Sequence, residues 1–442
     1  MPTPTARAQR VAEAAKPAAA AAAIEPCPYL RPADKAMLKI SLPVILFTLS
    51  LGAFGQKPDT AYTKKQLART DVQLLLSWYE QDGEHSAVTG GKGTEKLTVF
   101  APALSFQHQF DPANHLDVDV GVDVITSAST DKIDFVYSSA SRQDIRGHGN
   151  IGYRHFFKKT GLTVGSSSAI SIESDYFSLG GGLSLSHQNP AQTREVGLRV
   201  QAFFDDLRWG LFEDHGRGIG LIYPAELDDK EWFDSYTRRS FNAELSISQV
   251  INQRLILAFF PGINYQHGQL ATPFHRVFFN DDKTKKVENL PGHRFKIPLG
   301  MQANAFISGR WVVRAYYRWY WDDFGIRAHT ADIETPVKIT PVFTISPFGR
   351  FYAQTASRHF RPFGEHALTR IFYTSDYDLS EFQSWKIGLG LRWVPFKKMG
   401  KRSNFNAIGL RYAFYQRSDG LAAHTLTMLW EGSLEGKERR EK

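Results

Sequence analysis

One stretch of the chain, Leu116 to Val124, restricts its fold more than any other, because aliphatic residues alternate there with aspartate or glycine. Successive side chains of a β-strand point to opposite faces, so this strand would have an aliphatic face and a face carrying Asp117, Asp119 and Asp123. A helix would mix both kinds of side chain on every face. Weaker copies of the pattern recur along most of the chain, which is typical of the wall of a membrane β-barrel.

Sixteen segments with this alternation predict the fold class. It is all-β: a transmembrane, antiparallel, up-and-down β-barrel of about 16 strands, with roughly 14 to 18 as the range. From Trp385 to Trp393, aromatic residues bracket an aliphatic centre, as expected where a strand crosses both interfaces of a bilayer. The expected strands are residues 71–82, 95–110, 114–125, 142–157, 162–172, 177–187, 194–209, 236–250, 255–267, 293–307, 311–321, 335–346, 351–357, 379–394, 405–416 and 421–430.

The connections between these segments mostly alternate in length. A bacterial barrel with both chain ends in the periplasm alternates tight inner turns with longer outer loops, so this pattern favours a barrel over a soluble sandwich or propeller. Two connections depart from it, a short one near Ser174 and a longer one at 395–404. The short connections are residues 111–115, 158–161, 188–193, 251–254, 308–310 and 347–350.

Composition excludes other classes of protein. The chain is 42% hydrophobic and has a mean hydropathy of -0.32, which excludes a polytopic helical membrane protein. The net charge is +8, but the basic residues are spread along the chain and no nucleic-acid-binding module has its signature here. We therefore expect no nucleic-acid partner.

The only apolar run of helical character, Leu38 to Phe54, predicts a secretory signal peptide over residues 37–55. Residues 1–36, rich in Ala and Pro, are expected to be a disordered or misannotated extension, residues 56–430 the barrel, and residues 431–442 a charged tail. The predicted location is the bacterial outer membrane. The single cysteine, Cys27, lies in the extension, so the expected mature chain has no thiol for a disulfide, a metal site or catalysis.

If the aliphatic face of each strand meets lipid, the charged residues between must point into the lumen, because an arginine facing lipid at mid-membrane costs roughly 2 to 4 kcal/mol. Such residues could select charged solutes by a field across the lumen, or could pair with one another and fill the interior. The lumen candidates are Asp117, Asp119, Asp123, Arg314, Arg318, Arg392 and Arg411.

The segment Ser127 to Asp144 is dense in hydroxyl and carboxylate side chains. It could bind a ligand or fold into the pore as a constriction, and the same residue types also make turns that satisfy their own backbone. The candidates for ligand binding are Ser127, Ser129, Thr130, Asp131, Ser138, Ser139, Ser141, Arg142 and Asp144.

No pattern predicts catalysis, a cofactor or a metal. Neither His148 nor His424 has the neighbours that a barrel phospholipase needs, so we expect no enzyme. Several histidines on or beside two predicted outer loops could meet Glu365 or Asp281, but their spacing does not support a metal site and scattered surface histidines are expected. These histidines are His267, His275, His293, His359 and His366.

Two stretches, Trp78 to Leu104 and Gly121 to Asn150, resemble a family of outer-membrane proteins known as a domain of unknown function, DUF3570. The resemblance covers most of the expected mature chain and is strongest over residues 71–153. It implies a secreted β-barrel of no known activity. It also implies a possible periplasmic thioredoxin-like protein or small lipoprotein as partner, beside outer-membrane lipid and the barrel insertion machinery.

Two functions remain open. The first is a porin-like channel, or the membrane component of a transport or export system for small solutes. The second is a plugged barrel that serves as a binding or scaffold protein for a periplasmic or surface partner, through long loops near residues 210–235, 268–292 and 358–378.

Overall fold

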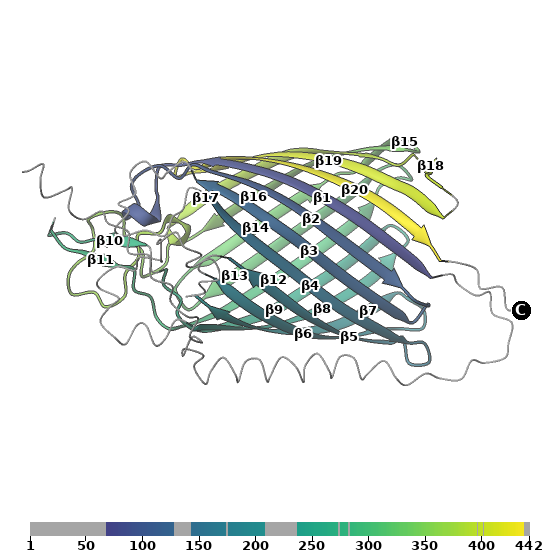
Figure 1. Ribbon diagram of the computed structural model, residues 1–442, viewed down its shortest axis with the longest axis horizontal. Helices are drawn as coiled ribbons and strands as arrows, with labels where there is room; N and C mark the ends of the chain where they lie inside the picture. The colour runs from purple at the N-terminus through teal and green to yellow at the C-terminus, as the bar shows by residue number, and fades with distance from the viewer. Residues whose placement is uncertain are drawn as a thin grey trace, which may run out of the picture. The chain divides into compact units, whose positions relative to one another are not determined.

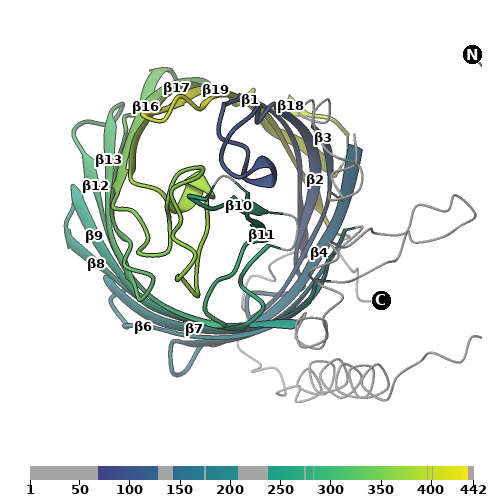
Figure 2. The same ribbon diagram turned by 90° about the vertical axis from the view of Figure 1, so that its left-hand side faces the viewer.

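The computed structural model describes residues 68–127, 143–173, 176–207, 237–272, 275–281, 283–395, 397–400 and 402–436, all within the unit Tyr62–Lys442. Their strands form one antiparallel sheet that closes on itself, because β20 pairs with β1 as well as with β19 (Figures 1 and 2). Eighteen strands take part in the sheet. Two of these, β15 and β18, continue β14 and β17 after an interruption, so the wall has 16 strands and the predicted fold class is confirmed.

The wall strands follow one another around the barrel in chain order. They are β1 (Arg69–Asp82), β2 (Leu97–Gln109), β3 (Asn114–Ser127), β4 (Gln143–Phe157), β5 (Leu162–Ile172), β6 (Phe177–Gln188), β7 (Arg194–Asp206), β8 (Thr237–Asn252), β9 (Leu255–Gly268), β12 (His293–Phe306), β13 (Val312–Asp322), β14 (Arg327–Glu334) with β15 (Val337–Thr340), β16 (Phe343–Gln354), β17 (Phe382–Trp393) with β18 (Lys397–Lys398), β19 (Ser403–Arg417) and β20 (Ala422–Glu435).

The alternation along each strand sorts side chains between the two faces of the wall. On β3, Val120 and Val122 are outward and exposed, and on β17 the outward Ile387 is 61% exposed. A soluble protein does not leave a continuous belt of large apolar side chains in water, so this outer face is a lipid-facing surface. Among the described residues, no helix is both long and apolar enough to cross a membrane.

The two ends of the barrel differ in their connections. One, the turn end, carries tight turns such as Lys158–Gly161 and Pro341–Val342, and the described chain begins and ends there. The other, the loop end, carries the long described connections 83–96, 269–292 and 355–381 (Figure 1). The expected turns at 111–115, 158–161, 188–193, 251–254 and 308–310 all lie at the turn end.

The expected strands 335–346 and 351–357, and the expected turn 347–350, are wrong. Pro347 lies inside β16, opposite the break between β14 and β15, where its carbonyl accepts from the Thr335 amide. A proline lacks the N–H that a ladder needs, and here that side of β16 faces the break, so no ladder bond is lost. The last strand also continues to Glu435, beyond the predicted end at Trp430.

The three long loops pack together into what we call the loop cap, the described residues of 83–96, 269–292 and 355–381. Viewed from the loop end, the cap lies inside the ring of strands (Figure 2). Its centre is a buried apolar cluster of Val277, Phe279 and Tyr373, to which the hairpin of β10 (Arg276–Phe278) and β11 (Lys285–Val287) contributes Val277. The loop 83–96 joins it through His85, whose ring stacks on Tyr377 at 3.7 Å between centroids.

Candidate functional site

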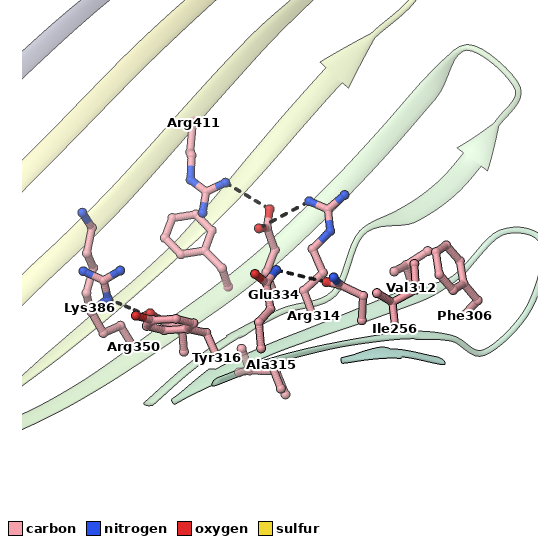
Figure 3. Close-up of a pocket in the computed structure, with 16 residues that line it drawn as sticks. Ile256, Phe306, Val312, Arg314, Ala315, Tyr316, Glu334, Arg350, Lys386 and Arg411 are labelled. Atoms are coloured by element: carbon pink, nitrogen blue, oxygen red, sulfur yellow. Dashed lines mark hydrogen bonds and ion pairs between the residues drawn. The ribbon is translucent and has the colours of Figure 1, made fainter. Parts of the chain in front are cut away.

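A cavity of about 640 Å³ lies against the inner wall of β12 to β19 (Figure 3). Four basic side chains line it, which we call the basic cluster: Arg314 of β13, Arg350 of β16, Lys386 of β17 and Arg411 of β19. Two carboxylates of β14, Asp332 and Glu334, lie among them. The cavity therefore has two more positive than negative groups.

The ion pairs of the cluster show that it faces the lumen. Arg411 donates to Glu334 at 3.0 Å, although β16 and β17 lie between their two strands. Side chains can meet across two intervening strands only on the concave face of a barrel. The Arg411 guanidinium lies 3.6 Å from the ring centroid of Phe348, a cation–π contact. Gly388 gives that ring its room, since a Cβ there would overlap Phe348 and the Tyr412 carbonyl.

The basic cluster is solvated. The side chains of Arg314, Arg350 and Arg411 are 53%, 52% and 45% exposed, even though they point inward. Arg350 pairs with Asp332 at 2.5 Å and Arg314 with Glu334 at 3.8 Å, while Lys386 forms no ion pair with a described residue. Ion pairs this exposed contribute little to stability, so these arginines are free to exchange their carboxylate partners for another anion.

The opposite part of the wall carries an excess of carboxylates. On β3, Asp117 pairs with Arg154 at 3.0 Å, Asp123 lies 3.8 Å from Arg146, and Asp119 accepts from the Asn150 amide at 3.4 Å. In the ring of 16 strands, β3 and β4 lie across from β13 and β14, as Figure 2 shows for β4 and β13. With three aspartates against two arginines, this side of the lumen carries one more negative than positive group, while the side of the basic cluster carries two more positive than negative groups.

The structure places all seven lumen candidates on the inner face, and gives most of them partners that sequence reasoning did not name. Arg392 pairs with Glu431 at 2.6 Å, reaching across β19. Arg318 lies opposite Gly300 and Thr330 and forms no ion pair with a described residue. Alternation on β4 would have identified Arg146 and Arg154, because both lie on the face of the strand away from lipid.

Most of the loop candidates lie outside the described residues: Ser129, Thr130, Asp131, Ser138, Ser139, Ser141 and Arg142. Ser127 is the last residue of β3. Asp144 lies at the start of β4, where its carboxylate accepts from the Ile145 amide at 2.9 Å. Their suggested role in ligand binding stays a prediction.

A second group of polar residues lies in the loop cap. His275 Nδ1 is 3.7 Å from an oxygen of Glu288 and 3.8 Å from an oxygen of Asp376. Burial raises the pKa of Asp376 to about 6, against the opposing effect of His275. Burial by itself would lower the pKa of His275, but Glu288 and Asp376 raise it above its usual value. His366 lies apart from this group, with its Nε2 donating to the Thr374 carbonyl at 2.9 Å.

The closed wall, its apolar outer face and its charged interior define an outer-membrane-type β-barrel. The chain belongs to the DUF3570 family, described as proteins of unknown function, whose family model matches residues 135–429, more than half of the chain. The match begins after β3, so the stretch Trp78 to Leu104 lies before it. No curated protein matches the sequence.

Several solved structures are similar in fold. One, a bacterial polysaccharide outer membrane secretin, has 9% identity and a TM-score of 0.43, over 85% of this chain and 100% of that chain. OccK1 (OpdK) of Pseudomonas aeruginosa has 9% identity and a TM-score of 0.39, over 83% and 98%. A deltaS2S3 mutant of TodX, a monoaromatic hydrocarbon channel, has 11% identity and a TM-score of 0.39, over 84% and 91%.

Proposed function

We propose that this protein is a porin-like channel of the bacterial outer membrane that passes small solutes and favours anions. The basic cluster carries the proposal, because four cations, three of them arginines that are about half exposed, line a lumenal cavity of about 640 Å³ together with two carboxylates. The apolar outer belt and the signal peptide expected over residues 37–55 support the location.

The chemistry of the basic cluster suits a channel that lets an anion pass better than a site that binds the anion tightly. A channel must attract its solute enough to admit it and bind it weakly enough to release it. An anion entering the cavity meets Lys386, which has no ion-pair partner among the described residues, and then competes with Glu334 and Asp332 for the guanidinium groups. Those carboxylates return to the arginines as the solute leaves. The acidic wall at β3 repels anions toward the basic side.

Conductance of the purified protein in planar lipid bilayers tests the proposal. In a gradient of KCl, the reversal potential of the wild type should indicate a preference for chloride. Arg350→Gln removes one positive charge and leaves Asp332 unpaired, so the reversal potential should shift toward cation selectivity. Arg310→Gln is the matched control, because Arg310 lies in an exposed turn between β12 and β13 and should leave selectivity unchanged. A folded protein that gives no current, or an Arg350→Gln channel with wild-type selectivity, contradicts the proposal.

A second function, a plugged barrel that acts as a scaffold, is favoured by one observation. The loop cap has its own buried cluster of Val277, Phe279 and Tyr373, as a fixed plug would. A periplasmic thioredoxin-like protein or a small lipoprotein, suggested by the family resemblance, would then be a partner. A folded barrel that never conducts, yet retains such a protein in a pull-down, would support the scaffold over the channel.

A further inference from the structure

We propose that His275, Glu288 and Asp376 bind one divalent transition-metal ion of the zinc class, and that this ion ties the loop between β9 and β12 to the loop between β16 and β17. This site lies in the loop cap, apart from the basic cluster of the lumen. It concerns how the cap is held together and does not depend on whether the barrel conducts.

The geometry leaves a space for an ion between three ligand atoms. His275 Nδ1, one oxygen of Glu288 and one oxygen of Asp376 all lie within 4.8 Å of one another. The two distances from Nδ1 to the carboxylates, 3.7 and 3.8 Å, are too long for hydrogen bonds. Ligands at about 2.1 Å from a tetrahedral zinc ion are about 3.4 Å apart, so small side-chain movements would complete the site.

The His275 nitrogen that points at the two carboxylates, Nδ1, is not engaged in a hydrogen bond with any described residue. His275 Nδ1 is shielded from solvent and has no hydrogen-bond partner in the part of the chain that the structure describes. A shielded polar atom without a partner is destabilising, and a metal ion would satisfy it. One protonated imidazole could offset only one of the two facing carboxylates, whereas a divalent ion balances both.

The ligands are held by hydrogen bonds that leave their metal-facing atoms available. The carboxylate of Glu288 is almost fully buried, with Thr374 Oγ1 donating to Oε1 and the Thr272 amide to Oε2, each keeping a free lone pair. The Asp378 amide donates to Asp376 Oδ1 at 2.9 Å, so Oδ2 stays open toward His275. Such outer partners orient metal ligands and tune their affinity.

The donor set selects the class of metal. An imidazole nitrogen with two carboxylate oxygens suits Zn²⁺, Co²⁺ or Mn²⁺, whereas Ca²⁺ and Mg²⁺ take oxygen ligands alone. Three protein ligands leave the fourth position of a tetrahedral ion to water. Because Glu288 and Asp376 lie in different loops, the ion would cross-link two parts of the cap that the chain itself does not connect closely.

Calorimetric titration of the full-length, untagged barrel in detergent with ZnCl₂ tests the site. The wild type should bind one Zn²⁺ per chain, while Glu288→Gln and Asp376→Asn should each weaken binding at least about tenfold. Glu365→Gln is the matched control, since Glu365 is an exposed carboxylate of the same loop as Asp376 and should bind as the wild type does. Wild-type protein that takes up no zinc, or variants that bind as tightly as the wild type, would overturn the proposal.

A measurement on the wild type alone guards against variants that misfold. Zn²⁺ should slow amide hydrogen exchange in residues 275–288 and 371–378, and leave exchange in the turn 158–161 unchanged. Co²⁺ should give visible absorption bands of a nitrogen- and oxygen-ligated site. Exchange that Zn²⁺ alters everywhere or nowhere, or colourless Co²⁺ protein, argues against the site even where every variant fails to fold.

Discussion

Asp111 fixes the turn between β2 and β3 with three hydrogen bonds. Its Oδ1 accepts from the amides of Ala113 at 2.8 Å and Asn114 at 2.9 Å, and its Oδ2 accepts from the Asn114 side chain at 2.7 Å. Asp111→Ala removes both acceptor oxygens and with them all three hydrogen bonds, and we expect it to lower the free energy of unfolding by about 1 kcal/mol. Urea titration of the protein in lipid vesicles, followed by tryptophan fluorescence, would measure this loss.

The charge of Asp111 gives this prediction a dependence on pH. Although burial opposes it, the hydrogen bonds from Asn114 and Ala113 lower the pKa of Asp111 below its ordinary value of 3.8. A lowered pKa stabilises the folded state above the ordinary value, and the effect disappears as the pH falls through the folded-state pKa. Wild type and Asp111→Ala should therefore differ at pH 7 and converge in acid. A difference that does not shrink as the pH is lowered from 7 through the folded-state pKa would contradict this explanation.

Gly388 is a position where the lumenal packing permits no side chain. Its hydrogen atoms face Phe348 and the Tyr412 carbonyl, and backbone cannot move aside as a flexible side chain can. We expect Gly388→Ala to reduce the yield of folded barrel, seen as the heat-modifiable band on a gel. Gly147→Ala is the control, because nothing lies within 4 Å of a Cβ there. Equal yields for the two variants would contradict the close approach.

At the scale of residues, the sequence is sufficient to place a side chain on a face but not to find its partner. Alternation alone puts Asp119 and Arg318 in the lumen. The pair of Arg411 and Glu334 depends on how the wall curves and on which strands stand three apart in the ring, and neither property is local to the sequence. The same limit applies to the cap, where His275 and Asp376 meet through loops without periodicity.

Among the elements, the strands could be predicted wherever turn residues and alternation agree. They conflict in β16, where Pro347 and Gly349 suggest a turn but lie within a paired strand. The true turn, Pro341–Val342, falls inside an expected strand because Ile339 and Val342 continue an apolar run. Whether the turn lies at Pro341–Val342 or at Pro347–Gly349 is decided by the break between β14 and β15, and this break is visible only in the pairing of the strands.

The hairpin of β10 and β11 is the element of the cap whose deletion should least disturb the wall of the barrel. It supplies Val277 to the buried cluster but pairs with no wall strand. Replacing residues 276–287 by a short Gly-Ser linker should widen the entrance at the loop end, so single-channel conductance should rise. Selectivity should keep its sign, because the basic cluster is untouched. A variant whose gel mobility shows a folded barrel but whose conductance matches the wild type would show that the hairpin does not restrict flow.

The barrel as a whole depends on its apolar outer face. Ile387 is among its most exposed apolar residues, and Ile387→Arg would place a charge against lipid at a cost of about 2 to 4 kcal/mol if it lies near mid-membrane. Equilibrium unfolding in vesicles should show this loss, and Ile387→Leu should unfold almost as the wild type does. A loss of less than about 1 kcal/mol for the arginine variant would place Ile387 near an interface.

The division of the lumen into an acidic and a basic side is also a property of the whole molecule. Salt screens such a field, with a Debye length near 10 Å at 0.1 M and about 3 Å at 1 M. The preference for anions should therefore be strong in dilute KCl and weak in 1 M KCl. Reversal potentials measured over this range at a constant concentration ratio test the prediction. Selectivity independent of salt would mean that the choice of ion is made by short-range contacts instead.

The arginines of the lumen differ in exposure from one level of the barrel to another. Near the loop end, Arg417 of β19 is only 6% exposed, held by Asp378 and Asp419, while the arginines of the basic cluster stay wet. The cap thus contacts the wall through the buried Arg417 guanidinium, although its partner in the cap, Asp378, is 77% exposed, whereas Asp419, in the turn between β19 and β20, is 10% exposed.

The pairing of Arg69 with Glu435 joins the first strand of the wall to the last. Until β20 arrives, β1 and β19 each present an unpaired edge, and edges of this kind recruit other chains into aggregates. The strand that closes the wall is also the last one to be synthesised, so the wall stays open until the whole chain has been delivered. A barrel built in this way needs a chaperone or assembly factor that covers the edges of β1 and β19 until β20 is in place.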